Sequence, residues 1–313
     1  MQKPAILILS EDAGDYVPLL GGLSGRGIPI STAQTVTEAR TNGSGQQVLL
    51  AQPDLAAEAL PFMPEVRWIQ STWAGITPLL GFQRDGLQLT GVKDVFGSQI
   101  SEYVLAYLLA REIRLLTRVE LQKEKRWSNT PSGHLHDKTL CIMGTGSIGQ
   151  HLASVARAFG MRTLGYSLSG RSVPGFEQVY THESFHEFLA EADYLVAILP
   201  DTTETDSLLD ATAFRKMKNS AYLVNVGRGN VLDEKALARA LDNSELAGAA
   251  LDVFQREPLP VDSPLWTTKN CLISAHVAAK SKAADIADIF LENYRRFEQG
   301  EALKFLVDME RGY

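Results

Sequence analysis

The sequence has few cysteines, no long apolar run and no excess of positive charge. Its two cysteines, Cys141 and Cys271, each lie in an apolar strand-like run. We therefore expect them to pack in a core rather than to form a disulfide framework or a metal site. No run of about 18 apolar residues is present, which argues against a membrane-spanning helix. The N-terminal apolar run is too short for a secretory signal, so a cytoplasmic protein is expected.

Charge and length limit the functional classes further. The formal net charge is -7, from 30 basic and 37 acidic residues. Nonspecific binding to nucleic acid depends on clustered Lys and Arg, so this balance opposes it. The 313 residues, 45% of them hydrophobic, suffice for two globular domains with ordinary cores. We expect a folded protein with a small-molecule partner and no nucleic-acid or membrane partner.

Short apolar runs alternate with helical segments along nearly the whole chain, which is the pattern of parallel strands joined by helices. Four runs mark a small α/β domain in the first ~95 residues, and six more follow between residues 139 and 277 as a doubly wound sheet. One long helix is expected from Ser98 to about Trp127, ended by the loop at 129–133. A final amphipathic helix, from about Ser281 to Gln299, is expected to return to the first domain.

The predicted fold is therefore α/β, with two doubly wound parallel-sheet domains. A dinucleotide-binding Rossmann domain, residues 98–281, is inserted in a flavodoxin-like substrate domain made of residues 1–97 and 282–313.

The stretch GTGSIG, with Gly144, Gly146 and Gly149, fits the G-x-G-x-x-G pattern of a dinucleotide site. An apolar strand precedes it, and the residues after it have the apolar spacing of a helix. The glycines permit a tight turn and close approach of the backbone to a pyrophosphate, while the helix N-terminus offers unpaired N–H groups to the anion. A strand–turn–helix connection without a ligand is the alternative.

The next strand ends at Ser167, where an NAD site carries an acid for the ribose hydroxyls. Ser167 and Ser169 offer hydroxyl donors, and Arg171 follows with a guanidinium that suits a 2'-phosphate. The stretch therefore predicts NADP as the preferred cofactor over NAD. The alternative is that Arg171 is a solvated surface residue and that the loop accepts either cofactor.

Three charged or titratable residues follow three of the predicted strands: Arg228, Glu257 and His276. Ligands bind outside the carboxyl ends of the strands in such a sheet, so we expect all three to share one site. Histidine carries a proton near neutral pH, a neighbouring carboxylate favours the imidazolium, and arginine binds a carboxylate through paired N–H donors. Together they suit the reduction of a 2-oxo acid. Taken singly, each also has an ordinary structural interpretation.

At these motifs the sequence resembles the D-isomer-specific 2-hydroxyacid dehydrogenases. GTGSIG, ILPDTTET, LVNVGRGNVLDEKAL, LDVFQREPLPVDSPLW and ISAHVAA stand in the family's order, and the REPLP...SPLW form is most similar to the glyoxylate/hydroxypyruvate reductase A branch. The resemblance implies that Arg228 orients the substrate, that His276 is the acid/base and that Glu257 tunes it.

The resemblance also assigns binding residues. It implies that Asp252 contacts the nicotinamide carboxamide and that the loop STWAGI, with Trp73, Ala74 and Gly75, binds substrate; Trp73 either lines the substrate pocket or packs between domains. The remaining cofactor contacts that it implies are Ser147, Ile148, Leu199, Pro200, Thr205, Val226, Gly227 and Ala278. It further implies a homodimer built on the second domain, with the long helix and the loop around Trp127 reaching the partner.

Several alternatives stay open. The same fold resembles certain dinucleotide-regulated corepressors, so a sensing protein without turnover is one alternative. A dehydrogenase for a phosphorylated 2-hydroxy acid is another. The stretch HESFH, residues 182–186, matches a zinc motif, but it lies in a short connection without a third histidine, so no metal site is expected and a solvated helix face is favoured.

Overall fold

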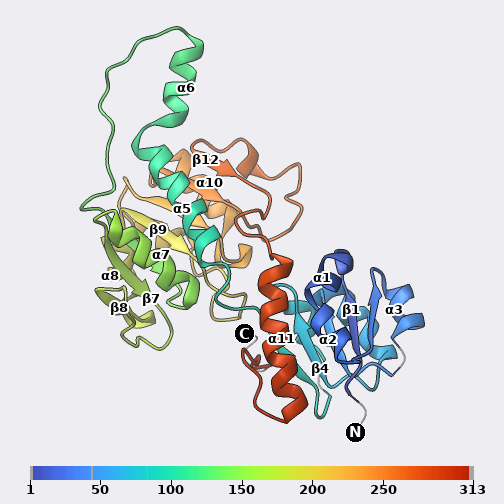
Figure 1. The fold of residues 1–313 in the computed structure, drawn as a ribbon. Coiled ribbons are helices and arrows are strands. Elements are labelled where there is room, and N and C mark those ends of the chain that lie inside the picture. The colour runs from blue at the N-terminus through green and yellow to red at the C-terminus, as the bar shows by residue number, and fades with distance from the viewer. Residues whose placement is uncertain (1–2, 44, 83, 310–313) are drawn as a thin grey trace. The chain divides into compact units, whose positions relative to one another are not determined.

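The computed structural model describes residues 3–43, 45–82 and 84–309, and the chain divides into two compact units (Figure 1). Unit 1 comprises Met1–Val95 and Ser281–Tyr313, and unit 2 comprises Phe96–Lys280. Each unit contains its own parallel sheet with helices around it, as the sequence pattern predicts.

Unit 1 contains a five-stranded sheet in the order β2-β1-β3-β4-β5, with every pair parallel. This is the flavodoxin-like order expected from the sequence. The strands are β1 (Ile6–Leu9), β2 (Ile30–Ala33), β3 (Val48–Ala51), β4 (Trp68–Ser71) and β5 (Gln88–Thr90). The helices are α1 (Ala13–Leu19), α2 (Gly21–Gly25), α3 (Val36–Asn42), α4 (Pro53–Ala59) and α11 (Ala283–Gln299), with short 3-10 turns η1 (Leu60–Phe62) and η2 (Thr77–Leu79).

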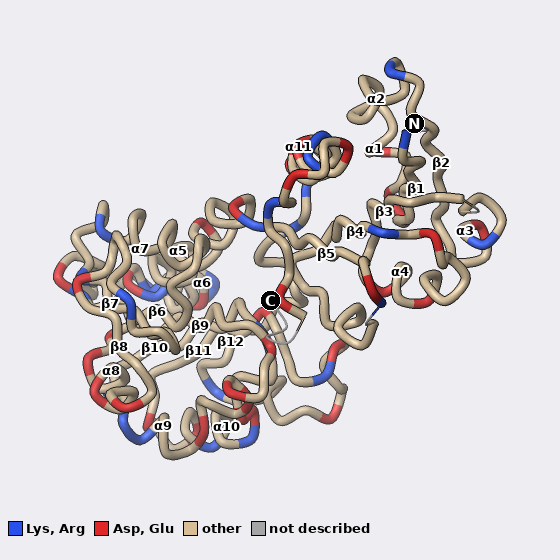
Figure 2. The backbone as a smooth tube through the Cα atoms, turned by 90° about the horizontal axis from the view of Figure 1, so that it is seen from below, with Lys and Arg blue, Asp and Glu red and all other residues tan. Residues whose placement is uncertain are grey.

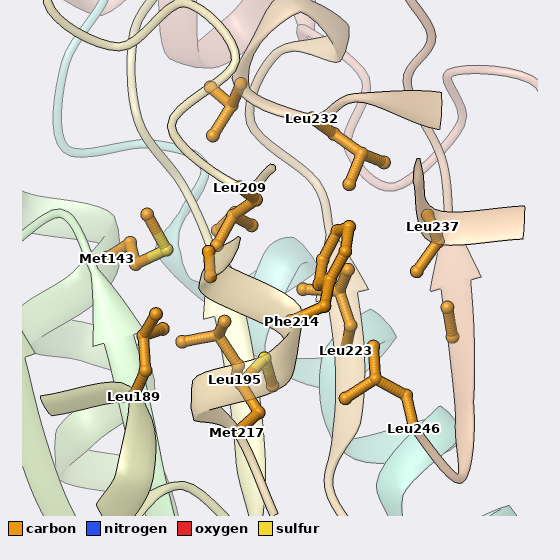
Figure 3. Close-up of a cluster of buried hydrophobic side chains, with 14 of the residues drawn as sticks. Met143, Leu189, Leu195, Leu209, Phe214, Met217, Leu223, Leu232, Leu237 and Leu246 are labelled. Carbon is orange, nitrogen blue, oxygen red and sulfur yellow. The ribbon is translucent and has the colours of Figure 1, made fainter. Parts of the chain in front are cut away.

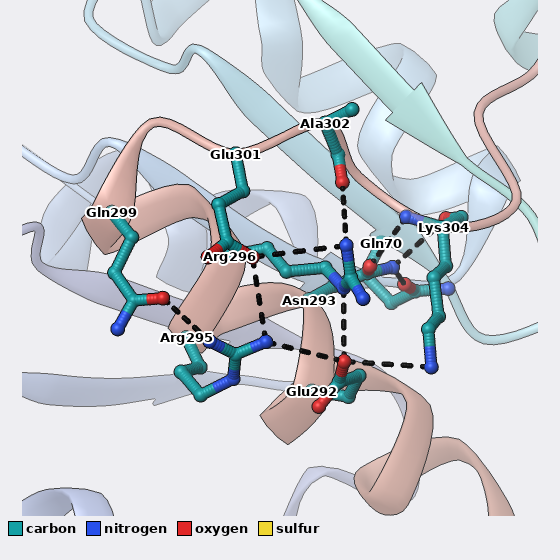
Figure 4. A network of polar contacts seen from close by, with 9 residues as sticks. All are labelled: Gln70, Glu292, Asn293, Arg295, Arg296, Gln299, Glu301, Ala302 and Lys304. Carbon is teal, nitrogen blue, oxygen red and sulfur yellow. Dashed lines mark hydrogen bonds and ion pairs between the residues drawn. The ribbon is translucent and has the colours of Figure 1, made fainter.

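Helix α11 belongs to unit 1. The ring of Trp68 on β4 is fully buried and stacks on Phe290 of α11, with 5.1 Å between ring centroids. Buried Asn293 donates to Gln70 Oε1 at 3.2 Å and accepts from the Lys304 amide at 2.8 Å. Around it, Glu292, Arg295 and Arg296 form a surface network of ion pairs (Figure 4). Aromatic packing and one buried amide therefore fasten the C-terminal helix to the sheet.

Unit 2 contains a seven-stranded parallel sheet in the order β12-β11-β10-β9-β6-β7-β8. The strands are β6 (Thr139–Met143), β7 (Arg162–Tyr166), β8 (Gln178–Tyr180), β9 (Tyr194–Ala197), β10 (Tyr222–Asn225), β11 (Gly248–Leu251) and β12 (Cys271–Ile273). The helices are α5 (Gly97–Glu112), α6 (Leu115–Lys123), α7 (Ser147–Ala158), α8 (Phe185–Glu191), α9 (Ala211–Lys216) and α10 (Glu234–Asp242). Short 3-10 turns are η3 (His182–Ser184), η4 (Gly229–Val231) and η5 (Pro264–Trp266).

Two edge strands were absent from the sequence prediction. We predicted four strands in the first sheet and six in the second, but the structure adds β2 and β8. Strand β2 has the sequence ISTA and is partly exposed, and β8 has only three residues, QVY. An edge strand is half solvated and needs no continuous apolar run, so the criterion that finds buried parallel strands misses it.

The predicted single helix from Ser98 to Trp127 was also wrong. Helix α5 ends at Glu112, and α6 begins at Leu115 after Arg114, which has a left-handed backbone with φ 54°. Apolar spacing continues through Leu115 and Val119, but these side chains are exposed and α6 has no buried residue. The spacing alone could not reveal the break because it marks an apolar face, not what that face packs against.

One hydrophobic cluster of unit 2 lies on the face of its sheet that α8, α9 and α10 cover. Figure 3 shows Phe214 of α9 among leucines from β9, β10 and the surrounding segments. Phe214, Leu195, Leu223 and Leu237 are fully buried. Cys141 is buried in β6 and Cys271 half-buried in β12, and both are free thiols, as expected from core packing. Burial raises the pKa of Cys271 to about 12, which keeps the thiol protonated and unreactive.

Charged residues are almost excluded from the strands. Among the strands of the described residues, only β7 carries one, Arg162 at its first position. Lys, Arg, Asp and Glu instead lie on the helices and loops, as α8, α9 and α10 illustrate (Figure 2). Buried parallel sheets require this distribution because both faces are covered. Across the part of the chain that the structure describes, no helix is both long and apolar enough to cross a membrane.

Candidate active site

The carboxyl ends of three adjacent strands carry the three residues singled out as catalytic candidates. Arg228 follows β10, Glu257 follows β11 and His276 follows β12, and these strands are neighbours in the order β10-β11-β12. Both strand pairs are parallel, so the three loops leave the sheet at the same end, where the carboxyl ends of the strands lie. The topology of unit 2 thus gathers the three loops at one end of its sheet.

His276 and Glu257 form a direct pair. Their atoms Nδ1 and Oε2 are 2.8 Å apart, and Glu257 Oε1 accepts from the Phe254 amide at 3.0 Å. A carboxylate oxygen only accepts, so Nδ1 carries the proton and the Glu257 contact fixes the ring orientation. The His276 side chain stays 52% exposed. Nε2 is therefore the ring nitrogen left for a ligand.

His276 has a left-handed backbone, with φ 54°, which is uncommon outside glycine. Four hydrogen bonds to Asp252 hold this conformation. The Asp252 carbonyl accepts from the His276 amide at 2.7 Å. The carboxylate accepts from Ser274 Oγ at 2.6 Å, from the Val277 amide at 2.9 Å and from the Ala278 amide at 2.8 Å. Asp252 is only 1% exposed, and its bonds to the loop offset the cost of burying its charge.

Arg228 lies on a tightly packed loop and is partly buried. Its Nη1 donates to the Gly227 carbonyl at 2.7 Å, and its own carbonyl accepts from buried Asn225 at 3.0 Å. Burial lowers the pKa of Arg228, while the charges of Asp201 and Glu257 act in the opposite direction. Its guanidinium forms no ion pair among the described residues. A desolvated guanidinium with unused N–H groups is suited to bind an anionic ligand.

The glycine loop after β6 has the conformation that a pyrophosphate site needs. Gly144 has φ 111°, and a Cβ on Gly149 would lie 2.0 Å from the Gly144 carbonyl oxygen. A Cβ on Gly146 would meet nothing within 4 Å, so the protein leaves open space beside that residue. No side chain caps the N-terminus of α7. The free amides and this open space fit the phosphates of a dinucleotide.

The loop after β7 contains the residues singled out for cofactor choice. The Ser167 hydroxyl is buried and has no hydrogen-bond partner among the described residues, while Ser169 and Arg171 are exposed. The Arg171 amide donates to Ser169 Oγ at 3.4 Å, but its guanidinium forms no ion pair within the described part of the chain. No carboxylate occurs from residue 167 to residue 171.

The remaining residues implied as cofactor contacts lie on loops that contact one another. Thr205 Oγ1 donates to the Pro200 carbonyl at 2.7 Å, which folds the loop after β9. A Cβ on Gly227 would lie 2.9 Å from Leu199 backbone atoms, so this loop and the one after β10 pack without space for a side chain. Ser147 and Ile148 open α7, Val226 is buried beside Gly227, and Ala278 donates to Asp252.

Unit 1 places the expected substrate loop after β4. Ser71 Oγ accepts from the Trp73 amide at 3.0 Å and donates to the Trp73 carbonyl at 2.6 Å, which folds the loop at this residue. Trp73 is 38% exposed. The amides of Ala74 and Gly75 donate to no acceptor among the described residues. Adjacent unused amides are suited to bind a carboxylate.

Sequence reasoning missed three residues that build the site. Asn225 fixes the Arg228 turn, and Ser274 joins the His276 loop to Asp252. Gly229 is required because a Cβ there would lie 1.8 Å from the Phe254 carbonyl carbon, which keeps the Arg228 and Glu257 loops in contact. A polar residue at the end of a buried strand was the available signal for Asn225. No local pattern marks Gly229, whose neighbour lies 25 residues further along the chain.

The HESFH stretch lies outside this arrangement. His182 belongs to η3 and His186 to α8, and both side chains are exposed, as the solvated interpretation predicts. Within residues 3–43, 45–82 and 84–309, no group of three His, Cys, Asp or Glu side chains is placed to hold a metal ion.

Comparison with known proteins identifies the family. The model of the D-isomer specific 2-hydroxyacid dehydrogenase NAD binding domain matches residues 105–278, more than half of the chain. The chain belongs to this family. It is therefore an NAD(P)-dependent oxidoreductase, and the resemblance inferred from its motifs is confirmed.

Relatives within the family are similar over most of the chain. Glyoxylate/hydroxypyruvate reductase A of Escherichia fergusonii is 35% identical over 217 residues, which are 69% of this chain and 70% of that protein. A family member from Aeromonas salmonicida has a crystal structure with TM-score 0.92 and 41% identity, covering 99% of this chain and 100% of that chain. The NADPH-dependent glyoxylate/hydroxypyruvate reductase of Sinorhizobium meliloti, solved with NADP and sulfate, has TM-score 0.84 and 28% identity, covering 99% and 100%.

The glycine loop of this dehydrogenase yields a matched pair of predictions. Gly146→Ala should fold normally, because its Cβ enters open space. It should weaken NADPH binding by about tenfold, because we expect the pyrophosphate to approach the backbone at this residue. Gly149→Ala should instead lower the melting temperature, because its Cβ collides with the Gly144 carbonyl. Fluorescence titration and thermal unfolding measure the two effects. Unchanged NADPH affinity in folded Gly146→Ala would contradict this assignment.

Proposed function

We propose that this protein uses NADPH to reduce a small 2-oxo acid, of the glyoxylate or hydroxypyruvate kind, to the D-2-hydroxy acid. The observation that carries the proposal is the pair of His276 and Glu257, whose Nδ1 and Oε2 atoms are 2.8 Å apart. The pair lies at the carboxyl end of the sheet, where Arg228 also lies. The names of the relatives from E. fergusonii and S. meliloti support this substrate class.

The residues divide the reaction between them. When bound, the nicotinamide supplies a hydride to the carbonyl carbon of the substrate. His276 gives a proton from Nε2 to the carbonyl oxygen, because its Nδ1 is held by Glu257 and Nε2 is the ring nitrogen left for the substrate. Arg228 binds the substrate carboxylate through its unused N–H groups. In unit 1, we assign Trp73, Ala74 and Gly75 to substrate binding, because the amides of Ala74 and Gly75 donate to no acceptor among the described residues and Trp73 is partly exposed.

The cofactor contacts follow from the local geometry of unit 2. We assign the pyrophosphate to the amides of Gly146, Ser147 and Ile148 at the uncapped start of α7. Asp252 accepts from the carboxamide of the nicotinamide. Leu199, Pro200, Thr205, Val226, Gly227 and Ala278 complete the assigned contacts, from loops at the same edge of the sheet.

Preference for NADPH rests on the loop after β7. No carboxylate is present from residue 167 to residue 171 to repel a 2'-phosphate. Ser167 has an unpartnered hydroxyl, Ser169 an exposed one, and Arg171 a guanidinium without an ion pair among the described residues. A phosphate would accept hydrogen bonds from the exposed Ser169 hydroxyl and the Arg171 guanidinium.

We further propose a homodimer through unit 2. Exposed apolar side chains follow one another along the end of α5, along α6 and in the loop after it: Leu109, Ile113, Leu115, Leu116, Val119 and Trp127. Trp127 is 97% exposed, and no residue of α6 is buried. A sizeable apolar patch of this kind is typical of a protein interface.

Replacing His276 tests the proposed chemistry. His276→Ala should lower kcat for glyoxylate reduction by about 100-fold or more, the range expected when a general acid is lost. His186→Ala is the matched control, because it removes an exposed histidine of unit 2 away from these strand ends, and it should keep full activity. The fall in nicotinamide absorbance as NADPH is oxidised measures both activities. Full turnover by His276→Ala would remove the histidine from the mechanism.

Replacing Arg171 tests the cofactor preference. A hydrogen bond to a charged group contributes about 1.5 to 3 kcal/mol, so Arg171→Ala should weaken NADPH binding about ten- to a hundredfold and leave NADH nearly unchanged. Arg157→Ala removes an exposed arginine at the other end of α7 and should affect neither cofactor. Titration with each cofactor distinguishes the outcomes. Equal weakening of NADPH and NADH would refute the phosphate contact.

The proposed dimer is tested by its oligomeric state. Wild-type protein should sediment as a dimer at micromolar concentration, and Trp127→Ala combined with Leu116→Glu should shift it toward monomer, because a charge in an apolar interface is not compensated. Analytical ultracentrifugation gives the mass. A wild-type protein that sediments only as a monomer excludes the interface.

A further inference from the structure

A chain of hydroxyl groups links helix α5 to the loop that bears His276. Ser274 Oγ donates to Asp252 Oδ1 at 2.6 Å, and the hydroxyl of Tyr103 on α5 forms a short hydrogen bond with the same Ser274 oxygen. Tyr107, one turn further along α5, has its hydroxyl 3.4 Å from that of Tyr103. None of these three hydroxyl residues belongs to the site as the sequence or the family resemblance defines it.

Counting protons fixes the direction of this chain. Asp252 is buried and accepts from two backbone amides, so its carboxylate is the acceptor at the end of the chain. The single proton of Ser274 is used toward Asp252, so Ser274 must accept from Tyr103. Burial raises the pKa of Tyr103 well above its usual value, so its phenol stays protonated and remains a donor. Tyr103 and Ser274 thus both point their protons toward Asp252, and Tyr107, 3.4 Å from Tyr103, is not part of this series.

We propose that Ser274 and Tyr103 are positioning residues that hold His276 in its reactive orientation through Asp252. The proposal rests on the assignment of His276 as the proton donor. Asp252 carries four bonds to residues 274–278, and two of these residues, Val277 and Ala278, directly follow the left-handed His276. A left-handed backbone at a residue other than glycine persists only where its surroundings fix it.

The hydroxyl groups of Tyr103 and Ser274 also set the orientation of the Asp252 carboxylate. Oδ1 accepts from Ser274 and Val277, whereas Oδ2 accepts only from Ala278. A carboxylate oxygen accommodates about two donors, so one acceptor direction remains on Oδ2. The hydroxyl chain therefore determines both the His276 loop and the oxygen that is left for the carboxamide.

The test compares Ser274→Ala, Ser274→Thr, Tyr103→Phe and the double variant Ser274→Ala/Tyr103→Phe. Loss of a hydrogen bond to a charged group should lower kcat in Ser274→Ala by about tenfold, with KM for glyoxylate changed less than about twofold. Ser274→Thr keeps the hydroxyl and should restore kcat. The double variant should be no slower than Ser274→Ala, because the effects of mutating residues that act through the same hydrogen-bonded series do not add. Tyr107→Phe is the matched control on the same face of α5, since it leaves the chain to Asp252 intact, and it should change kcat less than about twofold.

A second readout needs no cofactor and no turnover. The amides of Val277 and Ala278 donate to Asp252, so their hydrogen exchange in the unliganded enzyme should accelerate in Ser274→Ala by about tenfold. Unchanged kcat or unchanged exchange in Ser274→Ala would overturn the proposal, as would additive losses in the double variant. These outcomes are distinct from failure of the proposed function, which is shown by an active His276→Ala.

Discussion

The buried carboxylate of Asp252 is the interaction on which the candidate site depends. It lies just after β11, accepts one hydroxyl and two amide donors from the segment that follows β12, and its carbonyl accepts the amide of His276. Two neighbouring strand ends are thereby joined through one residue. The left-handed conformation of His276, and with it the ring that meets Glu257, follows from that junction. A buried charge without these donors would destabilise the fold, so charge burial and catalytic geometry are linked.

The Arg228 loop and the glycine loop are held by close backbone packing between loops at the carboxyl end of the sheet. Gly227 and Gly229 sit where any side chain would collide with the backbone of Leu199 or Phe254. Arg228 lies between these two glycines, and its partly desolvated guanidinium is held by a bond to the Gly227 carbonyl. The same close packing holds between Gly144, just after β6, and Gly149, in the first turn of α7. At Gly146 a Cβ would meet only open space, so packing within the protein does not require glycine there.

The sequence predicted the parts of this structure that leave a periodic or local pattern. Buried strands, the glycine loop, and polar residues at the ends of strands all do so, and the two parallel sheets and the family were confirmed. The sequence did not predict the edge strands β2 and β8, because a half-solvated strand needs no apolar run. The sequence did not predict the break at Arg114, because the helical spacing of apolar residues continues into α6 although these residues are not buried there. Ser274 and Tyr103 escaped because 171 residues separate them, and only the fold brings their hydroxyls together.

The central claim is that this arrangement turns over substrate rather than only sensing a dinucleotide. The most direct measurement is kcat/KM of the unmodified protein for glyoxylate and hydroxypyruvate, with NADPH and with NADH in parallel. The account predicts steady reduction of at least one of these acids, with NADPH favoured because no carboxylate opposes a phosphate from residue 167 to residue 171. A protein that binds NADPH but oxidises none of it across a panel of 2-oxo acids would contradict the account.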